Sequence, residues 1–150
     1  MSWTVRAAQS GDRAVLAEIY RRSSLSNVGD RPQLLAHPDA LELPWSHRAA
    51  ERTRVAIVDG QIVGFATLDI DGDRAELEDL FVDPASMRRG AATALLDEVV
   101  ANARAHGARQ LEVTANPHAL EFYVHVGFRD VGATKTRFGV GRRMRLELWD

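Results

Sequence analysis

A short run of arginines and small residues separates two apolar stretches of this sequence: Arg88-Arg89-Gly90-Ala91-Ala92-Thr93. The residues before it, Leu80, Phe81 and Val82, are typical of a buried strand, and the apolar residues after it recur at helical spacing. The first turn of a helix presents unpaired N–H groups and the positive end of the helix dipole, which attract anions. Glycine and alanine let phosphate oxygens approach the backbone, and the arginines can neutralise them. The run predicts a diphosphate site or, on the plainer interpretation, a turn that binds nothing.

A second candidate stretch predicts a short helix over residues 117–127, with proline at its first position and glycine at its end. Ala119, Phe122 and Tyr123 share one face of this helix by their three- and four-residue spacing. Such a face is ordinary core packing, or Ala119 and Phe122 cover an extended ligand while the Tyr123 hydroxyl points to its reactive end. Asn116, just before the helix, could cap it or hydrogen-bond the ligand through its amide.

The composition and charge of the chain predict one soluble domain over residues 1–150, 45% hydrophobic and 27% charged. A net charge of −2 indicates neither a nucleic-acid partner nor an anionic membrane surface. The absence of cysteine excludes disulfides, thiolate metal sites and an acyl-cysteine intermediate. The histidines lack metal-ligand spacing, so no metal is expected. No leader and no run of about 18 apolar residues is recognised, so we expect a cytoplasmic protein.

Turn residues and hydrophobic periodicity predict seven strands that must position these groups. Asp59-Gly60 suits a type I′ turn between two β-rich runs, and Asp71-Gly72-Asp73 repeats the signal before the next strand. The last strand alternates Met144, Leu146 and Leu148 on one face. The strands are expected at residues 3–7, 54–58, 62–68, 75–82, 110–114, 129–134 and 142–149.

Helices are expected between these strands, at residues 12–23, 90–107 and 117–127, with a short one inside 24–51. Asp12 is the predicted N-cap of the first helix, on which Val15, Leu16, Ile19 and Tyr20 form an apolar stripe. The stretch from 24 to 51 is rich in turn formers and predicts an irregular loop of the kind that often binds ligands. The alternation of strands and helices is typical of an α/β domain.

Taken together, the two candidate stretches carry a family resemblance that spans about Leu77–Phe128. They contain Val82, Arg88-Arg89-Gly90-Ala91-Ala92, Asn116-Pro117-His118-Ala119, Phe122-Tyr123 and Gly127-Phe128, and in these residues the chain resembles the GNAT acetyltransferases. The resemblance implies the GNAT acyl-CoA N-acyltransferase fold, a mixed central sheet of about six to seven strands flanked by about four helices. Met87 departs from the family's Gln or Arg at the start of the turn, which puts one side-chain contact in doubt.

The resemblance also implies a cosubstrate, acetyl-CoA, in a splay between the strands at 75–82 and 110–114. Backbone at Val82 would contact the pantetheine or the acetyl group, and a free N–H within residues 80–82 would stabilise the oxyanion of the tetrahedral intermediate. The implied cofactor-binding residues are Leu80, Phe81, Val82, Arg88, Arg89, Gly90, Ala91, Ala92, Thr93, Asn116, Ala119, Phe122 and Tyr123.

Acetyl transfer needs groups that move protons. An alkyl amine has a pKa of about 10.4, so its attack on a thioester benefits from a base. The resemblance implies Glu76 as that base, directly or through water, with Glu78 second; a solvated strand face explains both carboxylates equally well. Tyr123 lies at the family's position for the general acid that protonates the departing thiolate. Its alternative is a packed aromatic whose hydroxyl only hydrogen-bonds the cofactor.

The expected function is an N-acetyltransferase that moves acetyl directly, in a ternary complex, to a small-molecule amine. The alternatives are a non-catalytic acyl-CoA-binding sensor or regulatory module, a protein N-acetyltransferase, and an unrelated α/β ligand-binding domain. A monomer or a homodimer fits the resemblance. Acceptor choice is expected to lie with residues 24–51 and 134–143, whose charged candidates are Asp30, Arg31, Asp39, Glu42, Arg48, Arg137 and Arg142.

Overall fold

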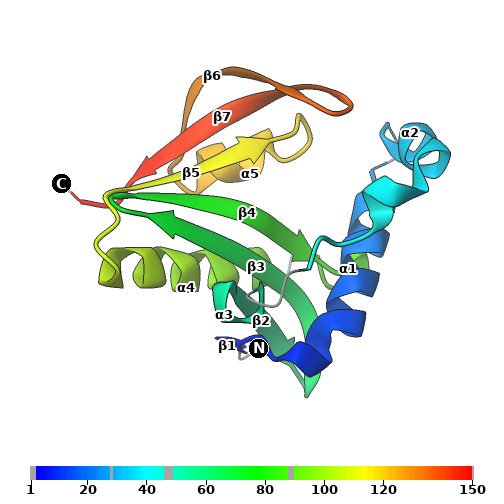
Figure 1. Ribbon diagram of the computed structural model, residues 1–150, viewed down its shortest axis with the longest axis horizontal. Coiled ribbons are helices and arrows are strands. Elements are labelled where there is room, and N and C mark those ends of the chain that lie inside the picture. Colours follow the sequence, from blue (N-terminus) through cyan, green and yellow to red (C-terminus); the bar gives the residue numbers. More distant parts are fainter. Residues whose placement is uncertain (1–2, 28, 46–48, 88–89, 150) are drawn as a thin grey trace. The chain divides into compact units, whose positions relative to one another are not determined.

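The computed structural model describes residues 3–27, 29–45, 49–87 and 90–149 (Figure 1). Among them, seven strands form one mixed sheet in the order β1-β2-β3-β4-β5-β7-β6. The strands are β1 (Thr4–Ala7), β2 (Thr53–Val58), β3 (Gln61–Asp71), β4 (Arg74–Val82), β5 (Gln110–Ala115), β6 (Arg129–Thr136) and β7 (Gly139–Glu147). The helices are α1 (Arg13–Leu25), α2 (Arg31–Ala36), α3 (Ala49–Arg52), α4 (Ala91–Ala105) and α5 (Leu120–His125), with 3-10 turns η1 (Ser10–Asp12), η2 (Pro38–Leu41) and η3 (Pro84–Ser86). The α/β fold class is confirmed, with the short helix α3 in addition.

The chain forms two compact units. The first comprises Met1–Thr67 and Asp79–Val99, and the second comprises Leu68–Glu78 and Val100–Asp150. Strands β3 and β4 and helix α4 each contribute residues to both units. Each unit has buried side chains of its own, such as Phe65 in the first and Met144 in the second.

The core of the first unit forms between helix α1 and strands β2 and β3. Its buried cluster contains Ala8, Leu16, Ile19, Val55 and Phe65. Burying each large apolar side chain of this kind contributes about 1.5–3 kcal/mol to folding. The predicted stripe of α1 is therefore confirmed at Leu16 and Ile19. Val15, by contrast, is 44% exposed, because it lies at the edge of the stripe.

The turns of the first unit agree with the predictions from their residue types, with one exception at the start of α1. Asp59 and Gly60 have φ angles of 51° and 77°, which confirms the type I′ turn between β2 and β3. Asp12 precedes α1 as predicted, but its carboxylate does not cap that helix. Instead it accepts from the backbone N of Gln9 at 2.8 Å and pairs with Arg6 at 2.8 Å. This pairing ties the end of β1 to η1.

The ladder of β5, β7 and β6 organises the second unit. Strand β5 pairs antiparallel with β7 along all six of its residues, and β7 pairs with β6 on its other side. Leu111, Val113 and Met144 are buried on one face of this ladder. Because side chains alternate along strands, the polar residues between them lie on the other face.

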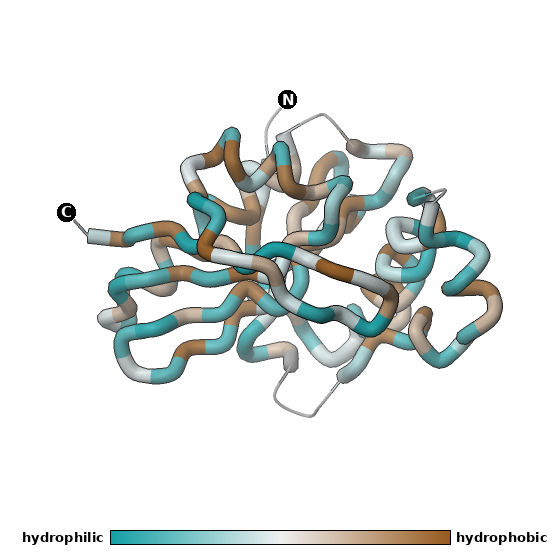
Figure 2. The backbone as a smooth tube through the Cα atoms, turned by 90° about the horizontal axis from the view of Figure 1, so that it is seen from above, coloured by the Kyte–Doolittle hydropathy of each residue, from teal (hydrophilic) through white to brown (hydrophobic). Residues whose placement is uncertain are grey.

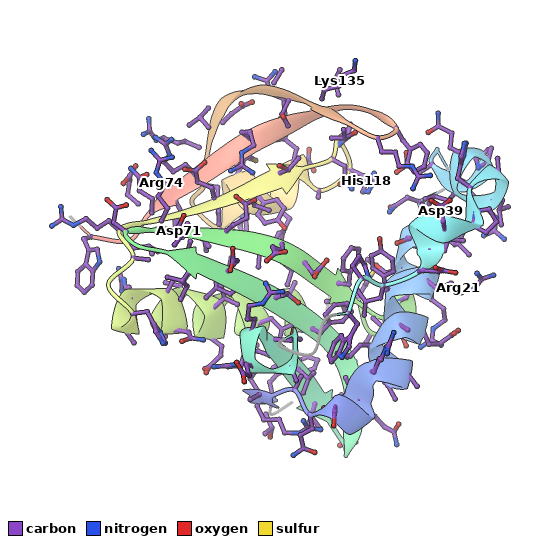
Figure 3. The ribbon with its side chains drawn as sticks, viewed as in Figure 1. Arg21, Asp39, Asp71, Arg74, His118 and Lys135 are labelled. Atoms are coloured by element: carbon purple, nitrogen blue, oxygen red, sulfur yellow. The ribbon has the colours of Figure 1, made fainter. Side chains whose placement is uncertain are left out.

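The second unit has two ends, which the labelled side chains of Figure 3 mark. Asp71 and Arg74 flank the turn into β4 at one end, where Gly72 has a φ of 62°, as the predicted turn requires. His118 and Lys135 lie at the other end. The residues just before α5 therefore lie at the end of this unit opposite the β3–β4 turn.

Hydrophobic residues occur along the chain in short, interrupted stretches, seen as brown segments in Figure 2. Helix α4 has 15 residues. A helix of that size is about 22 Å long, against about 30 Å for the hydrocarbon core of a bilayer. In the part of the chain that the structure describes, no helix is long and apolar enough to cross a membrane.

Candidate active site

Helix α4 begins directly after Gly90, whose backbone oxygen accepts a hydrogen bond from the N–H of Ala94 at 3.0 Å. The φ of Gly90 is 92°, a conformation that glycine adopts without strain. A Cβ added there would lie 3.4 Å from Nε1 of Trp3, so the indole is a close neighbour of this turn. The turn therefore needs glycine for its backbone conformation, in addition to the small size inferred from the sequence.

The other predicted residues of this turn differ in exposure. Ala91 is buried, Ala92 is half-buried and Thr93 is exposed. Arg88 and Arg89 lie outside the described residues. Because the first N–H groups of a helix have no partner inside it, this end of α4 presents donors to an anion.

Hydrogen bonds and an ion pair hold the end of β4 that leads into the turn. The N–H of Asp83 donates to the backbone oxygen of Val63 at 2.7 Å. The Asp83 carboxylate accepts from the N–H of Ala85 at 3.1 Å and from Arg22 of α1 at 2.6 Å. These contacts fix the chain direction at the point where β4 ends.

The segment predicted to contact the cofactor, Leu80 to Val82, lies within the first unit and packs against its side chains. Val82 is buried and Leu80 half-buried. The ring of Phe81 lies 4.8 Å from that of Tyr20 and 5.7 Å from that of Phe65, centroid to centroid. Aromatic packing of this kind holds the backbone of the segment in one conformation.

Gly64 of β3 was missed by the sequence analysis and supports the same segment. A Cβ at Gly64 would lie 2.9 Å from the backbone oxygen of Phe81 and 3.3 Å from the side chain of Val82. The close approach of β3 to β4 therefore requires glycine. A glycine inside a β-rich run was the available signal.

The alternation of buried and outward-facing residues along β4 changes phase by one residue between Leu77 and Val82. Ala75 and Leu77 are buried, and so is Val82. Strict alternation would put positions 75 and 82 on opposite faces, and one extra residue, as in a β-bulge, produces such a shift. The parallel register with β5 also covers only residues 74–76 of β4. The later N–H groups of β4 therefore lie outside that ladder.

Tyr123 lies in α5 and is 6% exposed. Its ring meets those of Phe122 and Phe128 edge to face, each at a centroid distance of 5.3 Å. Gly127 ends the helix as predicted, with a φ of 105°, and the N–H of Phe128 donates to the backbone oxygen of Tyr123 at 2.9 Å. Burial raises the pKa of the Tyr123 phenol above its ordinary value. The hydroxyl therefore keeps its proton at neutral pH.

The start of α5 differs from the prediction. Residues 117–119 form a turn, and the helix begins at Leu120 with Ala119, half-buried, at the N-cap position. Asn116 is exposed, and its backbone oxygen accepts from the N–H of Ala119 at 3.0 Å. The prediction that Asn116 caps α5 is therefore wrong, because residues 117–119 close a turn on Asn116 and the helix starts only at Leu120, with Ala119 at its N-cap position. An amide contact from Asn116 to the cofactor stays a prediction.

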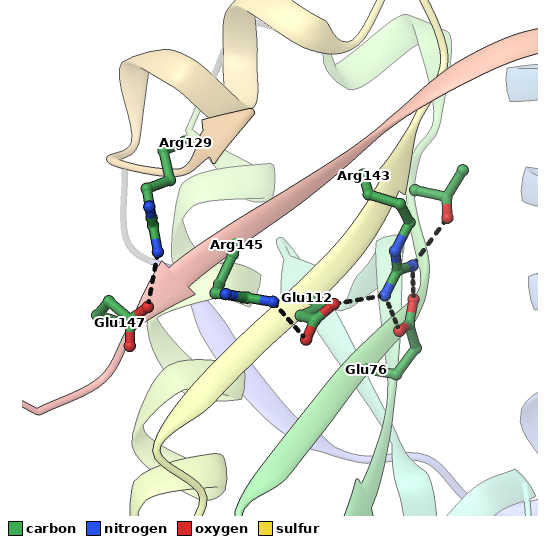
Figure 4. A network of polar contacts seen from close by, with 7 residues as sticks. Glu76, Glu112, Arg129, Arg143, Arg145 and Glu147 are labelled. Atoms are coloured by element: carbon green, nitrogen blue, oxygen red, sulfur yellow. Dashed lines mark hydrogen bonds and ion pairs between the residues drawn. The ribbon is translucent and has the colours of Figure 1, made fainter. Parts of the chain in front are cut away.

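Glu76, the predicted base, forms a two-pronged ion pair with Arg143 of β7 (Figure 4). Oε1 and Oε2 of Glu76 each accept from one terminal nitrogen of Arg143 at 2.8 Å. Both carboxylate oxygens therefore already hold a donor. Glu78, the second candidate, is exposed on the same strand.

Arg143 also joins β7 to β5. It donates to Oγ1 of Thr114 and to Oε2 of Glu112, both at 2.9 Å. The other oxygen of Glu112 lies 3.5 Å from Arg145. The bonds to Glu76 and Glu112 raise the pKa of Arg143, that to Glu76 contributing most. This network, Glu76, Glu112, Thr114, Arg143 and Arg145, is the polar network referred to below.

The sequence analysis missed the polar network as a unit. Inward positions at Met144 and Leu146 imply that Arg143 and Arg145 face outward, and this was the available signal. Their partners follow only from the sheet order, in which β7 lies next to β5.

Two of the charged residues predicted to choose the acceptor, Arg142 and Arg31, have partners within the chain. Arg142 pairs with Asp130 at 2.7 Å, and this hydrogen bond lowers the pKa of Asp130. Arg31 donates to the backbone oxygen of Leu25 at 3.3 Å. Arg48 lies outside the described residues. Within those residues, no group of three or more His, Cys, Asp or Glu is placed to hold a metal ion.

Comparison with known sequences points to one family. The acetyltransferase (GNAT) family model matches residues 15–128. The uncharacterized N-acetyltransferase MJ1207 of Methanocaldococcus jannaschii is 33% identical over 91 residues, 54% of this chain and 40% of the relative. The L-2,4-diaminobutyric acid acetyltransferase of Nocardia farcinica is 33% identical over 116 residues, 75% of this chain and 56% of the relative. The chain thus spans about half the length of these two relatives.

A solved structure with the same fold is the PaiA N-acetyltransferase from Thermoplasma acidophilum, in complex with coenzyme A. Its TM-score is 0.77 at 19% sequence identity, with 98% of this chain and 99% of that chain covered. At this identity the likeness shows a common fold.

Proposed function

The chain belongs to the GNAT family of acetyltransferases, and from this premise we propose that it moves acetyl from acetyl-CoA to a small-molecule amine. The observation that carries the proposal is the first turn of α4, where Gly90, at positive φ, starts a 15-residue helix of small first residues. Such an end offers several N–H groups to a diphosphate. Since the chain has no cysteine, transfer in a ternary complex is the simpler route.

We assign the diphosphate of acetyl-CoA to the backbone of residues 90–93, with Arg88 and Arg89 at its rim. The fit rests on Gly90, which has no side chain and is exposed, and on the small residues Ala91 and Ala92 at the start of the helix. The backbone of residues 80–82 is assigned to the pantetheine and to the oxyanion. The shift of burial along β4 supports this, because a bulge frees an N–H from the ladder.

The reaction forms a bond between the amine nitrogen and the acetyl carbon and breaks the carbon–sulfur bond. An acceptor that arrives as an ammonium ion loses two protons before it is an amide: one passes to the thiolate and one leaves to solvent. We assign the first removal to Glu76 and donation to the thiolate to Tyr123. Burial keeps the Tyr123 proton in place but makes the phenol a weaker acid than a thiol of pKa about 8.5. Donation to the thiolate is therefore uphill on its own, and it becomes favourable because the phenolate regains a proton from the nitrogen of the tetrahedral intermediate, which is the second proton that the acceptor loses.

The acceptor is proposed to be a small molecule. The relative from Nocardia farcinica is named for acetylation of L-2,4-diaminobutyric acid, a small amine, which favours this class over a protein acceptor. A non-catalytic module that binds acyl-CoA is the second candidate. It is favoured by one observation, that both oxygens of Glu76 already hold Arg143.

Release of free CoA thiol from acetyl-CoA across a panel of amines tests the proposal. We expect turnover on at least one class of amine, and a fall in kcat of at least about 100-fold in Tyr123→Phe. Calorimetry should give the same acetyl-CoA affinity for both proteins. The matched control is Tyr20→Phe, which removes a hydroxyl that donates to the backbone oxygen of Ala40 at 3.2 Å. Acetyl-CoA binding without any turnover would favour the non-catalytic module, and absence of binding would overturn both candidates.

A further inference from the structure

The guanidinium of Arg143 is at the centre of the polar network (Figure 4). Its two terminal nitrogens make four hydrogen bonds, two to Glu76 at 2.8 Å and one each to Thr114 and Glu112 at 2.9 Å. These bonds account for the four N–H groups of the terminal nitrogens. The position of the guanidinium is therefore set from two strands, β4 and β5.

The two carboxylates of the network differ in how firmly they are held. Glu112 is 12% exposed, whereas Glu76 is 37% and Arg143 is 29% exposed. Glu76 is thus the carboxylate that a solute reaches more readily. A solute carboxylate can take its place on Arg143 with the same two-pronged geometry, while Glu112 and Thr114 keep the guanidinium in place.

The charges of the network restrict which solute can enter. Two guanidiniums, Arg143 and Arg145, face two carboxylates, Glu76 and Glu112, so the charges balance. A simple amine would add an unpaired positive charge, and a simple acid an unpaired negative one. A molecule with both an ammonium and a carboxylate adds neither: its carboxylate takes the place of Glu76 on Arg143, and its ammonium takes the place of the guanidinium beside Glu76. Hydrogen-bonded pairing of opposite charges favours such a molecule.

We propose that the acceptor is a zwitterionic small molecule, an amino acid in the simplest case, and that Arg143 selects it by binding its carboxylate in place of Glu76. The exchange releases the oxygens of Glu76 beside the ammonium. Glu76 then accepts one ammonium proton, and the neutral nitrogen attacks the acetyl carbon as the carbon–sulfur bond breaks and the thiolate takes up a proton. The inference rests on the proposed function and adds its substrate class and a specificity residue.

Matched acceptors test the inference by kinetics. L-Ornithine and putrescine, or L-lysine and cadaverine, differ only by the carboxylate. In the wild type we expect kcat/KM to be at least about 10-fold higher for the amino acid of each pair. Arg143→Gln should abolish this preference by lowering kcat/KM for the amino acid, mainly through KM, to the level of the diamine in the same variant.

The control for this comparison is Arg142→Gln, the neighbouring arginine that pairs with Asp130 instead. Arg142→Gln should leave the preference for the amino acid over the diamine unchanged. A wild-type preference for the diamine, or an unchanged preference in Arg143→Gln, overturns the inference. Equal losses for both members of a pair also overturn it, because a purely structural tie between strands would act on both.

A binding measurement separates this inference from the enzyme proposal. Butyrate has a carboxylate and no ammonium, so in the wild type it must displace Glu76 and leave it unpaired. Glu76→Gln removes that competitor, and we expect butyrate to bind this variant at least about 5-fold more tightly, measured by ligand-detected NMR. Arg143→Gln should abolish binding. If butyrate bound both variants as it binds the wild type, Arg143 would not be a carboxylate site. If butyrate bound as expected but no amine were acetylated, the enzyme proposal would fail and the carboxylate site would stand.

Discussion

At the scale of single residues, the two groups proposed to move protons lie in opposite environments. Glu76 is partly exposed and shares both oxygens with the Arg143 guanidinium. Tyr123 is buried between Phe122 and Phe128. A carboxylate can release its partner and accept a proton, whereas a shielded phenol keeps its proton until the thiolate forms next to it and the acceptor nitrogen can replace that proton. The same fold thus separates base from acid by burial and charge.

The pH dependence of turnover follows from the protonation of Tyr123. Because burial raises its pKa above the ordinary value of about 10, the phenol stays neutral as the pH rises to 9 or 10. We expect kcat of the wild type to show no alkaline fall below about pH 10, since the proton donor is not lost there. The measurement is kcat from pH 6 to 10 at saturating substrates. An alkaline fall below about pH 9.5 that disappears in Tyr123→Phe would show that the phenol ionises earlier and contradict this argument.

At the scale of elements, helix α4 has a glycine at each end, and the two have different roles. Gly90 precedes the helix with a φ of 92°, and Gly107 follows it with a φ of 85°. Gly107 ends the helix, its N–H donating to the backbone oxygen of Arg104 at 3.0 Å. Both positions need glycine for the backbone, but only Gly90 lies at the end that attracts anions.

Replacing each glycine by alanine should separate stability from cofactor binding. Gly90→Ala and Gly107→Ala should each cost about 1–2 kcal/mol in the free energy of unfolding, because alanine is strained at positive φ. Only Gly90→Ala should weaken acetyl-CoA binding, by at least about 10-fold in calorimetry. Equal acetyl-CoA affinities in the two variants would show that the diphosphate does not bind at the first turn of α4.

Local signals in the sequence were enough to predict the backbone conformation where it depends on a single turn. Asp59-Gly60 and Gly127 have the positive φ angles that their predicted turns require. The start of α5 was misjudged, since Asn116 and Pro117 fit a helix start and a β-turn almost equally well, and the turn closes on Ala119. The type of each element was therefore predictable from the sequence, whereas the ends of an element were predictable only next to a glycine.

Contacts between distant strands could not be predicted in the same way. Glu76 and Arg143 are 67 residues apart, and alternation assigns each only to the outward face of its strand. Their meeting depends on the order β4-β5-β7, which no local pattern encodes. The candidate base was thus found from the sequence, and the arginine that holds it was not.

At the scale of the whole molecule, β3, β4 and α4 are divided between the two compact units. Each of these elements would lose backbone hydrogen bonds if only one unit folded, because half of the strand or helix would have no ordered continuation. We therefore propose that residues 1–150 fold as one domain. Each unit carries a tryptophan that can report on it: Trp45 packs against the core cluster of the first, and Trp149 donates to the backbone oxygen of Ala108 in the second at 2.9 Å.

Two variants that each keep one of these tryptophans, with the other and Trp3 replaced by phenylalanine, test cooperative folding. We expect their fluorescence transitions in urea to coincide with each other and with the far-UV circular dichroism, as two-state unfolding requires. Acetyl-CoA at about 100 times its Kd should add about 2.7 kcal/mol to the stability that both report. Ligand binding stabilises whatever unfolds together, so in a cooperative domain both transitions should shift by the same amount. A shift in the Trp45 transition alone would mean that the units unfold independently and that the stability of the cofactor turn is not shared with the polar network.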